Sequence, residues 1–264
     1  MKKLLAVLLS AVMVLGVSAC GSSSSSEEPA EETKQTEGTA EGIDVSDIKI
    51  GCIFIGDENE GYTYAHMKSV KDMQETLGIS DEQIIYKYNT PEDEACYDAA
   101  VDLAEQGCDI IFANSFGFED FILQAAEEYP EIQFCHATGY KAASSGLANV
   151  HNFFANIYEA RYVAGVVAGM KLAELYGADT DAKIGYVGAY SYAEVKSGYT
   201  AFFLGVRSIC PNVTMEVKYT GSWANQALEK ETAEALIADG CVLVSQHADT
   251  TGAASAAEAA GIYD

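Results

Sequence analysis

Apolar and polar positions follow one another in two series, in which short apolar runs alternate with longer amphipathic stretches. The first series predicts strands at 48–55, 84–88, 109–114 and 132–137, separated by helices at 64–77, 92–106 and 119–129. Short, continuous apolar strands separated by helices are typical of a parallel sheet that is covered on both faces. Because such crossovers are right-handed, the series predicts a doubly wound α/β lobe.

The second series follows a segment at 149–154 and a long helix expected at 157–176. Its predicted elements are strands at 183–188, 213–219 and 241–247 and helices at 193–208, 226–238 and 253–260. The two series open alike, with Lys49-Ile-Gly and Lys183-Ile-Gly. We therefore expect an N-terminal lobe over 48–154, a C-terminal lobe over 155–264 and a ligand cleft beyond the carboxyl ends of their strands.

The expected helix at 157–176 contains Gly165 and Gly169 in a G-x-x-x-G spacing. This spacing mediates dimerisation in membrane spans. Because Arg161 and Lys171 bracket the apolar part, the stretch is too short to span a bilayer, which needs about 20 residues. We expect the glycines to allow close packing of this helix against the sheet.

The first residues are typical of an exported lipoprotein. Lys2 and Lys3 precede an apolar run over 4–17, which is too short to cross a membrane and fits a secretory signal peptide. Small residues lead into Cys20 in a pattern that resembles a lipobox, so residues 1–20 form the expected signal segment; an ordinary signal peptide is the alternative. The Ser-rich and acidic stretch that follows predicts a disordered tether over 21–47. A lipid on Cys20 would anchor the protein on the extracytoplasmic face of the cell membrane.

The formal net charge is −25 at pH 7. This sign excludes nucleic acid as a partner, since phosphate backbones are bound by basic surfaces. It also excludes attraction to anionic lipids through a polybasic patch. Six cysteines remain after Cys20, without any C-x-x-C pair, and we expect small buried apolar residues rather than a metal or disulfide site.

The loop GDENEGYTYAH after the first strand carries acids and tyrosines but no Lys or Arg. A diphosphate would meet uncompensated like charge there. A neutral or weakly basic ring suits it better, because Tyr62 and Tyr64 offer flat faces and Asp57 can bind polar edges. A solvated turn with locally packed tyrosines remains the alternative.

Other strand ends repeat this chemistry and predict a binding cleft. The candidate ligand-binding residues at these ends are Ser115, Phe116, Tyr190, Glu194, Trp223, Gln246 and Asp249. A hydrolytic site using His247 and Asp249 is the weaker alternative, since the chain has no H-E-x-x-H, no G-x-S-x-G and no second spaced ligand pair. We therefore expect no enzyme activity, no cofactor and no metal.

Several motifs together resemble the basic membrane protein (BMP) family of substrate-binding lipoproteins, which serve ABC importers of purine nucleosides and bases. The motifs are Gly61-Tyr-Thr-Tyr-Ala-His66, Asn114-Ser-Phe-Gly-Phe118, Tyr158-Glu-Ala-Arg-Tyr-Val-Ala-Gly165, Lys183-Ile-Gly-Tyr-Val187, Glu194-Val195, Ala201-Phe-Phe-Leu-Gly205 and Gln246-His-Ala-Asp249. The resemblance covers 48–264 and implies capture of a purine nucleoside or base between two lobes and its delivery to ABC permease subunits.

By this resemblance Tyr62 and Trp223 would stack on the base, Ser115 and Phe116 would line the cleft, and Asp249 would bind a polar edge or hydroxyl. The family usually has Trp at the position of Tyr62 and an acid at the position of Met67, which leaves the base undetermined.

The resemblance also implies a type I periplasmic-binding-protein-like α/β fold of two lobes with parallel sheets. Family members continue past the position of Asp264, so we expect an incomplete second lobe, in a fragment or truncated product, with apolar edges left uncovered. A surface lipoprotein with an adhesion or sensing role is a second functional alternative.

Overall fold

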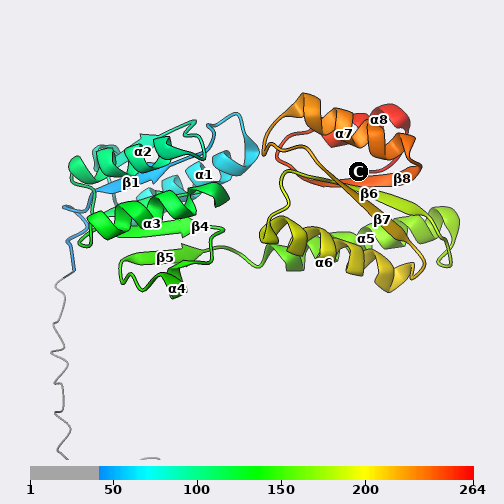
Figure 1. The fold of residues 1–264 in the computed structure, drawn as a ribbon, viewed down its shortest axis with the longest axis horizontal. Helices are drawn as coiled ribbons and strands as arrows, with labels where there is room; N and C mark the ends of the chain where they lie inside the picture. Colours follow the sequence, from blue (N-terminus) through cyan, green and yellow to red (C-terminus); the bar gives the residue numbers. More distant parts are fainter. Residues whose placement is uncertain (1–41) are drawn as a thin grey trace, which may run out of the picture. The chain divides into compact units, whose positions relative to one another are not determined.

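Two parallel sheets, each covered by helices on both faces, form the part of the chain that the computed structural model describes, residues 42–264 (Figure 1). The predictions for the signal segment and Cys20, and most of the tether prediction, lie outside the described residues. Residues 43–264 form one unit.

The first sheet has the strand order β2-β1-β3-β4-β5, and all neighbouring strands are parallel. Its strands are β1 (Ile50–Ile53), β2 (Ile84–Lys87), β3 (Ile110–Ala113), β4 (Gln133–Ala137) and β5 (Val150–Phe153). Its helices are α1 (Gly61–Leu77), α2 (Glu94–Glu105), α3 (Glu119–Glu128) and the short α4 (Ala142–Ser145). The sequence did not predict α4 or the two short 3₁₀ turns at Asp81–Gln83 and Phe116–Phe118.

Alternation of side chains along β1 builds the two cores of this lobe. Ile50, Cys52 and Phe54 belong to the apolar cluster on the α1 face. Ile53 points to the other face, into the cluster that α2 and α3 complete. Successive side chains of a strand point to opposite faces, so a continuous apolar run is what a doubly covered strand requires.

The second sheet has the order β7-β6-β8, again with parallel neighbours. Its elements are α5 (Ile157–Tyr176), β6 (Lys183–Gly188), α6 (Ala193–Ile209), β7 (Thr214–Tyr219), α7 (Gln226–Ala238), β8 (Cys241–His247) and α8 (Gly252–Ala260). Figure 1 shows α5 and α6 on one face of this sheet and α7 and α8 on the other, and each pair encloses its own apolar cluster. Beyond α8, Tyr263 forms an isolated parallel bridge with Leu243.

The glycines of α5 pack against helix α6, so the predicted packing of these glycines against the sheet is wrong. A Cβ built on Gly165 would lie 2.0 Å from the carbonyl oxygen of Phe202 on α6, and one on Gly169 would lie 2.8 Å from that of Val206. On α6, a Cβ on Gly205 would lie 2.2 Å from the carbonyl oxygen of Tyr162. Glycines on both helices therefore bring the two backbones into contact.

Helix α1 begins at Gly61, three residues before the predicted start, because the acidic loop supplies its cap. The Glu60 carboxylate accepts hydrogen bonds from the backbone N–H groups of Tyr62 and Thr63. Those N–H groups have no partner within the helix, so a side-chain acceptor at this position fixes where the helix starts. One carboxylate of the loop thus has a local structural role.

Five of the six described cysteines are buried, which agrees with the prediction of small buried residues, and all six are free in the structure. Within residues 42–264, none of the helices combines the length and the apolar character needed to cross a membrane.

Candidate functional site

A cavity lies at the carboxyl ends of strands from both sheets. It holds about 560 Å³ of empty space, part of it open to solvent. Its lining residues, which we call the inner cavity, are Ile55, Tyr62, Asn114, Ser115, Phe116, Thr138, Phe154, Ile157, Arg161, Glu194, Trp223, His247 and Asp249. Open parallel sheets bind ligands at this end of their strands.

Tyr62 and Asn114 form one wall of the inner cavity. The Tyr62 hydroxyl donates to the carbonyl oxygen of Asn114 at 2.6 Å. The Asn114 side chain in turn accepts from the backbone N–H of Ile55 at 3.0 Å, which ties the end of β3 to the end of β1. Burial, with smaller contributions from the Asp249, Glu194 and Glu60 carboxylates, raises the pKa of Tyr62, so the ring is a neutral phenol held in place by its hydroxyl.

Ser115 and Phe116 continue this wall and reach the second lobe. The Ser115 hydroxyl donates to Oε1 of Glu92 at 2.6 Å. The ring of Phe116 stacks on that of Tyr192, with centroids 4.6 Å apart and 19° between the planes. Tyr192 also stacks on Tyr190, and Trp223 packs against both, so aromatic rings from both lobes form one continuous group.

A buried polar cluster forms the floor of the inner cavity in the second lobe. The Arg161 guanidinium donates to the carbonyl oxygen of Gln246 at 3.0 Å. The imidazole Nε2 of His247 lies 2.8 Å from Oε1 of Glu194. Three buried atoms in or beside this floor have no partner among the described residues: Arg161 Nε and His247 Nδ1 in the floor, and Gln246 Oε1 next to it. Buried polar groups are normally bonded, so these atoms mark places where water or a solute can bind.

Asp249 lies between this floor and the cavity mouth. Burial, together with repulsion from the carboxylates of Glu60, Glu229 and Glu194, raises its pKa to about 8 even though Arg161 opposes the shift. The side chain is therefore mostly protonated at neutral pH. A protonated carboxyl group can donate one hydrogen bond and accept others, which suits a ligand edge that carries both donors and acceptors.

A larger outer cavity adjoins the inner one and shares Ile55, Trp223 and Asp249 with it. Asp57, Glu60 and Glu92 line this outer cavity, and its described lining residues include no Lys, Arg or His. The entrance therefore carries uncompensated negative charge.

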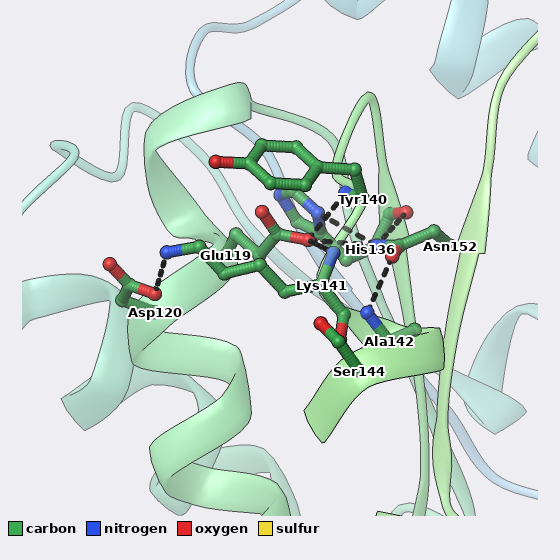
Figure 2. Close-up of polar contacts among 8 residues, drawn as sticks. All are labelled: Glu119, Asp120, His136, Tyr140, Lys141, Ala142, Ser144 and Asn152. Carbon is green, nitrogen blue, oxygen red and sulfur yellow. Dashed lines mark hydrogen bonds and ion pairs between the residues drawn. The ribbon is translucent and has the colours of Figure 1, made fainter. Parts of the chain in front are cut away.

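Behind the inner cavity, a polar network holds the chain that follows β4 (Figure 2). Oε1 of Glu119 accepts from the backbone N–H groups of Tyr140 at 2.6 Å and Lys141 at 2.7 Å, and from Asn152 at 3.2 Å. Nε2 of the fully buried His136 lies 2.6 Å from the carbonyl oxygen of Ser115. The network links β4, β5 and α3 to the backbone of a cavity residue.

The structure brings six of the ten predicted ligand-binding residues to the inner cavity: Tyr62, Ser115, Phe116, Glu194, Trp223 and Asp249. Asp57 and Tyr190 line the outer cavity instead. Two lie outside both. Tyr64 lies on α1 and is 54% exposed. The Gln246 amide donates to the carbonyl oxygens of Ala248 and Thr250, so it braces the loop that carries Asp249.

Sequence reasoning missed several lining residues. In the sequence Arg161 is a charge beside an apolar stretch and part of the motif Tyr158–Gly165, and neither signal indicates that its side chain lines a cavity. The sequence places His247 in the motif Gln246–Asp249 and in the hydrolytic alternative, but it does not predict that its Nε2 faces Glu194. Glu92 gave no signal, since it reaches the site from the loop before α2.

The sequence pattern of one protein family, described as ABC transporter substrate-binding protein PnrA-like (Bmp), matches residues 50–264. The chain belongs to this family. The resemblance stated from the sequence motifs is thereby confirmed. PnrA-like proteins are solute-binding proteins and not enzymes, which agrees with the prediction of no enzyme activity and leaves the hydrolase alternative without support.

Curated relatives of this PnrA-like chain include a purine-binding protein of Brucella abortus, 34% identical over 216 residues. That match covers 81% of this chain and 58% of the relative. A putative ABC transporter glucose-binding protein, TsgA13 of Haloferax volcanii, is 28% identical over 249 residues, which cover 89% of this chain and 60% of the relative. The chain thus spans less than two thirds of the length of either.

Solved structures confirm the predicted fold class, a two-lobe α/β fold like that of periplasmic binding proteins. An ABC transporter solute-binding protein of Aeropyrum pernix superposes with a TM-score of 0.68 at 19% identity and covers 81% of this chain and 59% of its own. An ABC transporter solute-binding protein of Conexibacter woesei superposes with a TM-score of 0.59 at 23% identity. The match covers 81% of this chain and 68% of that protein.

Proposed function

We propose that this protein is the extracytoplasmic solute receptor of an ABC importer, which captures a purine nucleoside or nucleobase in the inner cavity and delivers it to the permease. The observation that carries the proposal is the combination of aromatic and polar groups in one cavity. Tyr62, Phe116 and Trp223 supply flat faces, while Arg161, Glu194 and Asp249 supply polar groups close by. Purine rings need both, because they stack through their faces and bond through their edges.

The polar groups match the edges of a purine in donor and acceptor character. Arg161 donates, Glu194 accepts, and the protonated Asp249 can do both. Purine edges likewise present donors and acceptors side by side. The Brucella relative is described as purine-binding, and its similarity to this chain supports the same ligand class here.

Sugars are a second candidate, since the Haloferax relative is described as a putative glucose-binding protein. Sugars also stack on aromatic rings and form hydrogen bonds with carboxylates. A direct titration therefore distinguishes purines from sugars better than the chemistry of the cavity does.

Calorimetric titration of the purified protein with adenine, adenosine, guanosine and glucose tests the proposal. Trp223 is the only tryptophan of the chain, so ligand stacking is also expected to change the intrinsic fluorescence. Trp223→Ala should weaken purine binding by about 1–3 kcal/mol, the usual contribution of base–aromatic stacking. If glucose binds and the purines do not, the ligand is a sugar and not a purine. If none of the four compounds binds, the proposal is overturned.

In this role a lipid on Cys20 anchors the receptor on the extracytoplasmic face of the cell membrane. The lipobox-like pattern that leads into Cys20 supports this anchor. A Cys20→Ser variant should move from the membrane to the soluble fraction. Retention on membranes after a high-salt wash would count against the anchor without affecting the ligand proposal.

A further inference from the structure

Glu92 makes hydrogen bonds to both lobes through a single oxygen atom. Its Oε1 accepts from the Ser115 hydroxyl at 2.6 Å and from the backbone N–H of Gly117 at 2.8 Å, both in the first lobe. The same atom accepts from Nε1 of Trp223 in the second lobe at 3.1 Å. Because a carboxylate oxygen attracts donors more strongly than a neutral oxygen does, these bonds are of the stronger kind.

The surroundings leave Glu92 little freedom to move. A Cβ on Gly117 would lie 2.5 Å from Cδ of Glu92, so only glycine at this position lets the carboxylate approach the backbone. Among the described residues no Lys, Arg or His forms an ion pair with Glu92. Hydrogen-bond donors on both sides of the cleft take the place of a counter-charge.

Trp223 contacts both lobes through different parts of its side chain. Its ring lines both cavities and packs on Tyr190 and Tyr192 of its own lobe. Its one polar atom, Nε1, points to Glu92 across the cleft. Because its two partners belong to different lobes, this hydrogen bond exists only while the lobes are together.

We infer that Glu92 is a positioning residue of the solute site, which latches the closed lobes through Trp223 and so determines how long the solute stays bound. The inference rests on the proposed receptor function. It extends that function by assigning retention of the solute to a residue that does not line the inner cavity. Losing a hydrogen-bonded charged partner across an interface mainly speeds dissociation, so the dissociation rate should respond more than the association rate.

A double-mutant cycle with Glu92→Gln and Trp223→Phe tests the latch. Gln keeps the shape of Glu without its charge, and Phe keeps an aromatic ring without the N–H donor. With adenine as the probe, the two changes should be coupled by about tenfold in dissociation constant, which corresponds to ~1.4 kcal/mol. Additive effects, within about twofold, would overturn the inference.

The matched control is Glu58→Gln, which removes an exposed carboxylate from the loop that carries Asp57 and Glu60 but lines neither cavity. Stopped-flow measurement should show faster adenine release for Glu92→Gln and an unchanged rate for Glu58→Gln. Equal release rates for both variants and the wild type would contradict the latch.

Fluorescence of Trp223 gives a readout that needs no ligand. In the full-length Glu92→Leu variant the indole should become more accessible to acrylamide quenching than in Glu58→Gln. Unchanged quenching in Glu92→Leu would reject the latch. If wild-type protein binds no adenine, the purine proposal fails, and the quenching result still decides the latch by itself.

Discussion

The imidazole Nε2 of His247 lies 2.8 Å from Oε1 of Glu194, and only 9% and 11% of the two side chains are exposed. His247 ends β8 and Glu194 lies in the first turn of α6, so the pair joins two elements of the second lobe at the floor of the inner cavity. The other ring nitrogen of His247, Nδ1, is buried without a partner among the described residues. Within residues 42–264 the pair is thus the one polar contact of this ring.

Glu194→Ala is expected to destabilise the protein, because it leaves both ring nitrogens of His247 buried and unpartnered. The free energy of unfolding in urea should fall by about 1–3 kcal/mol. The control is Glu258→Ala, which removes an exposed carboxylate from α8 and should change stability by less than about 0.5 kcal/mol. Equal effects of the two substitutions would show that the His247 contact contributes nothing.

Asp249→Asn is expected to change how stability depends on pH. In the folded protein the pKa of Asp249 is about 8, above the ordinary value of 3.8, so the folded state holds this proton more tightly than the unfolded state. The stabilisation of the folded state by the protonated Asp249 is therefore fully present below about pH 4. It is lost progressively as the pH rises to about 8.

The asparagine variant cannot ionise, so it escapes this loss. It should resemble the wild type at pH 4 and exceed it at pH 8 by at least ~1 kcal/mol, since each unit of pKa shift corresponds to about 1.4 kcal/mol. Thermal unfolding of both proteins across this range measures the difference. A constant difference at all pH values would contradict the raised pKa.

Most elements could be predicted because each strand is a short apolar run and each helix a longer amphipathic stretch. The sequence prediction gives the bounds of α5, β6, α7 and β8 as the structure has them. The start of α1 could not be predicted, because a carboxylate in an apparent loop caps it. Helix–helix packing at Gly165 was also missed, since glycine spacing does not say which surface the glycine faces.

The candidate site was predictable only as far as residues follow the ends of strands. Ser115 and Asp249 follow the ends of β3 and β8, so the topology alone brings them to one edge. The contact of Glu92 with Trp223 joins positions 131 residues apart, and it depends on how the lobes meet. No local pattern carries that information.

Glu119→Ala is expected to loosen the chain that follows β4. It removes the acceptor shared by the N–H groups of Tyr140 and Lys141 and by the amide of Asn152. A fully buried donor left without a partner costs about 1–3 kcal/mol, and these three donors are only part-buried, so the free energy of unfolding should fall by about 1–2 kcal/mol. Glu119→Gln keeps an acceptor and should lose less. Hydrogen exchange should accelerate at Tyr140 and Lys141 in the Ala variant, and unchanged exchange there would refute the role.

Gly205→Ala should destabilise the contact between α5 and α6. The added methyl group would lie 2.2 Å from the carbonyl oxygen of Tyr162, so the helices must move apart. Overpacking of this kind costs about 1–3 kcal/mol. Gly61→Ala is the matched control, because its methyl group would meet nothing within 4 Å at the start of α1. In denaturant unfolding, Gly205→Ala should have a lower midpoint than Gly61→Ala. Equal midpoints for the two variants would argue against close packing at Gly205.

The acidic entrance predicts that the receptor discriminates against phosphorylated ligands. Asp57, Glu60 and Glu92 line the outer cavity, and no described Lys, Arg or His lines it with them. Even in bulk water two like charges about 4 Å apart repel by about 1 kcal/mol, and less solvated carboxylates repel more. We therefore expect adenosine to bind at least about tenfold more tightly than AMP at low salt.

Ionic strength separates this repulsion from a steric effect of the phosphate. The Debye length falls from about 30 Å at an ionic strength of 0.01 M to about 8 Å at 0.15 M. The preference for adenosine over AMP should therefore shrink as salt is added. At low salt, Glu92→Gln should also reduce the preference for adenosine over AMP, and it should do so more than Glu58→Gln does. The reason is that Glu92 lines the outer cavity and Glu58 does not. Calorimetric titrations at the two salt concentrations measure both effects. A preference that is the same at both would mean that the phosphate is excluded by lack of space and not by charge.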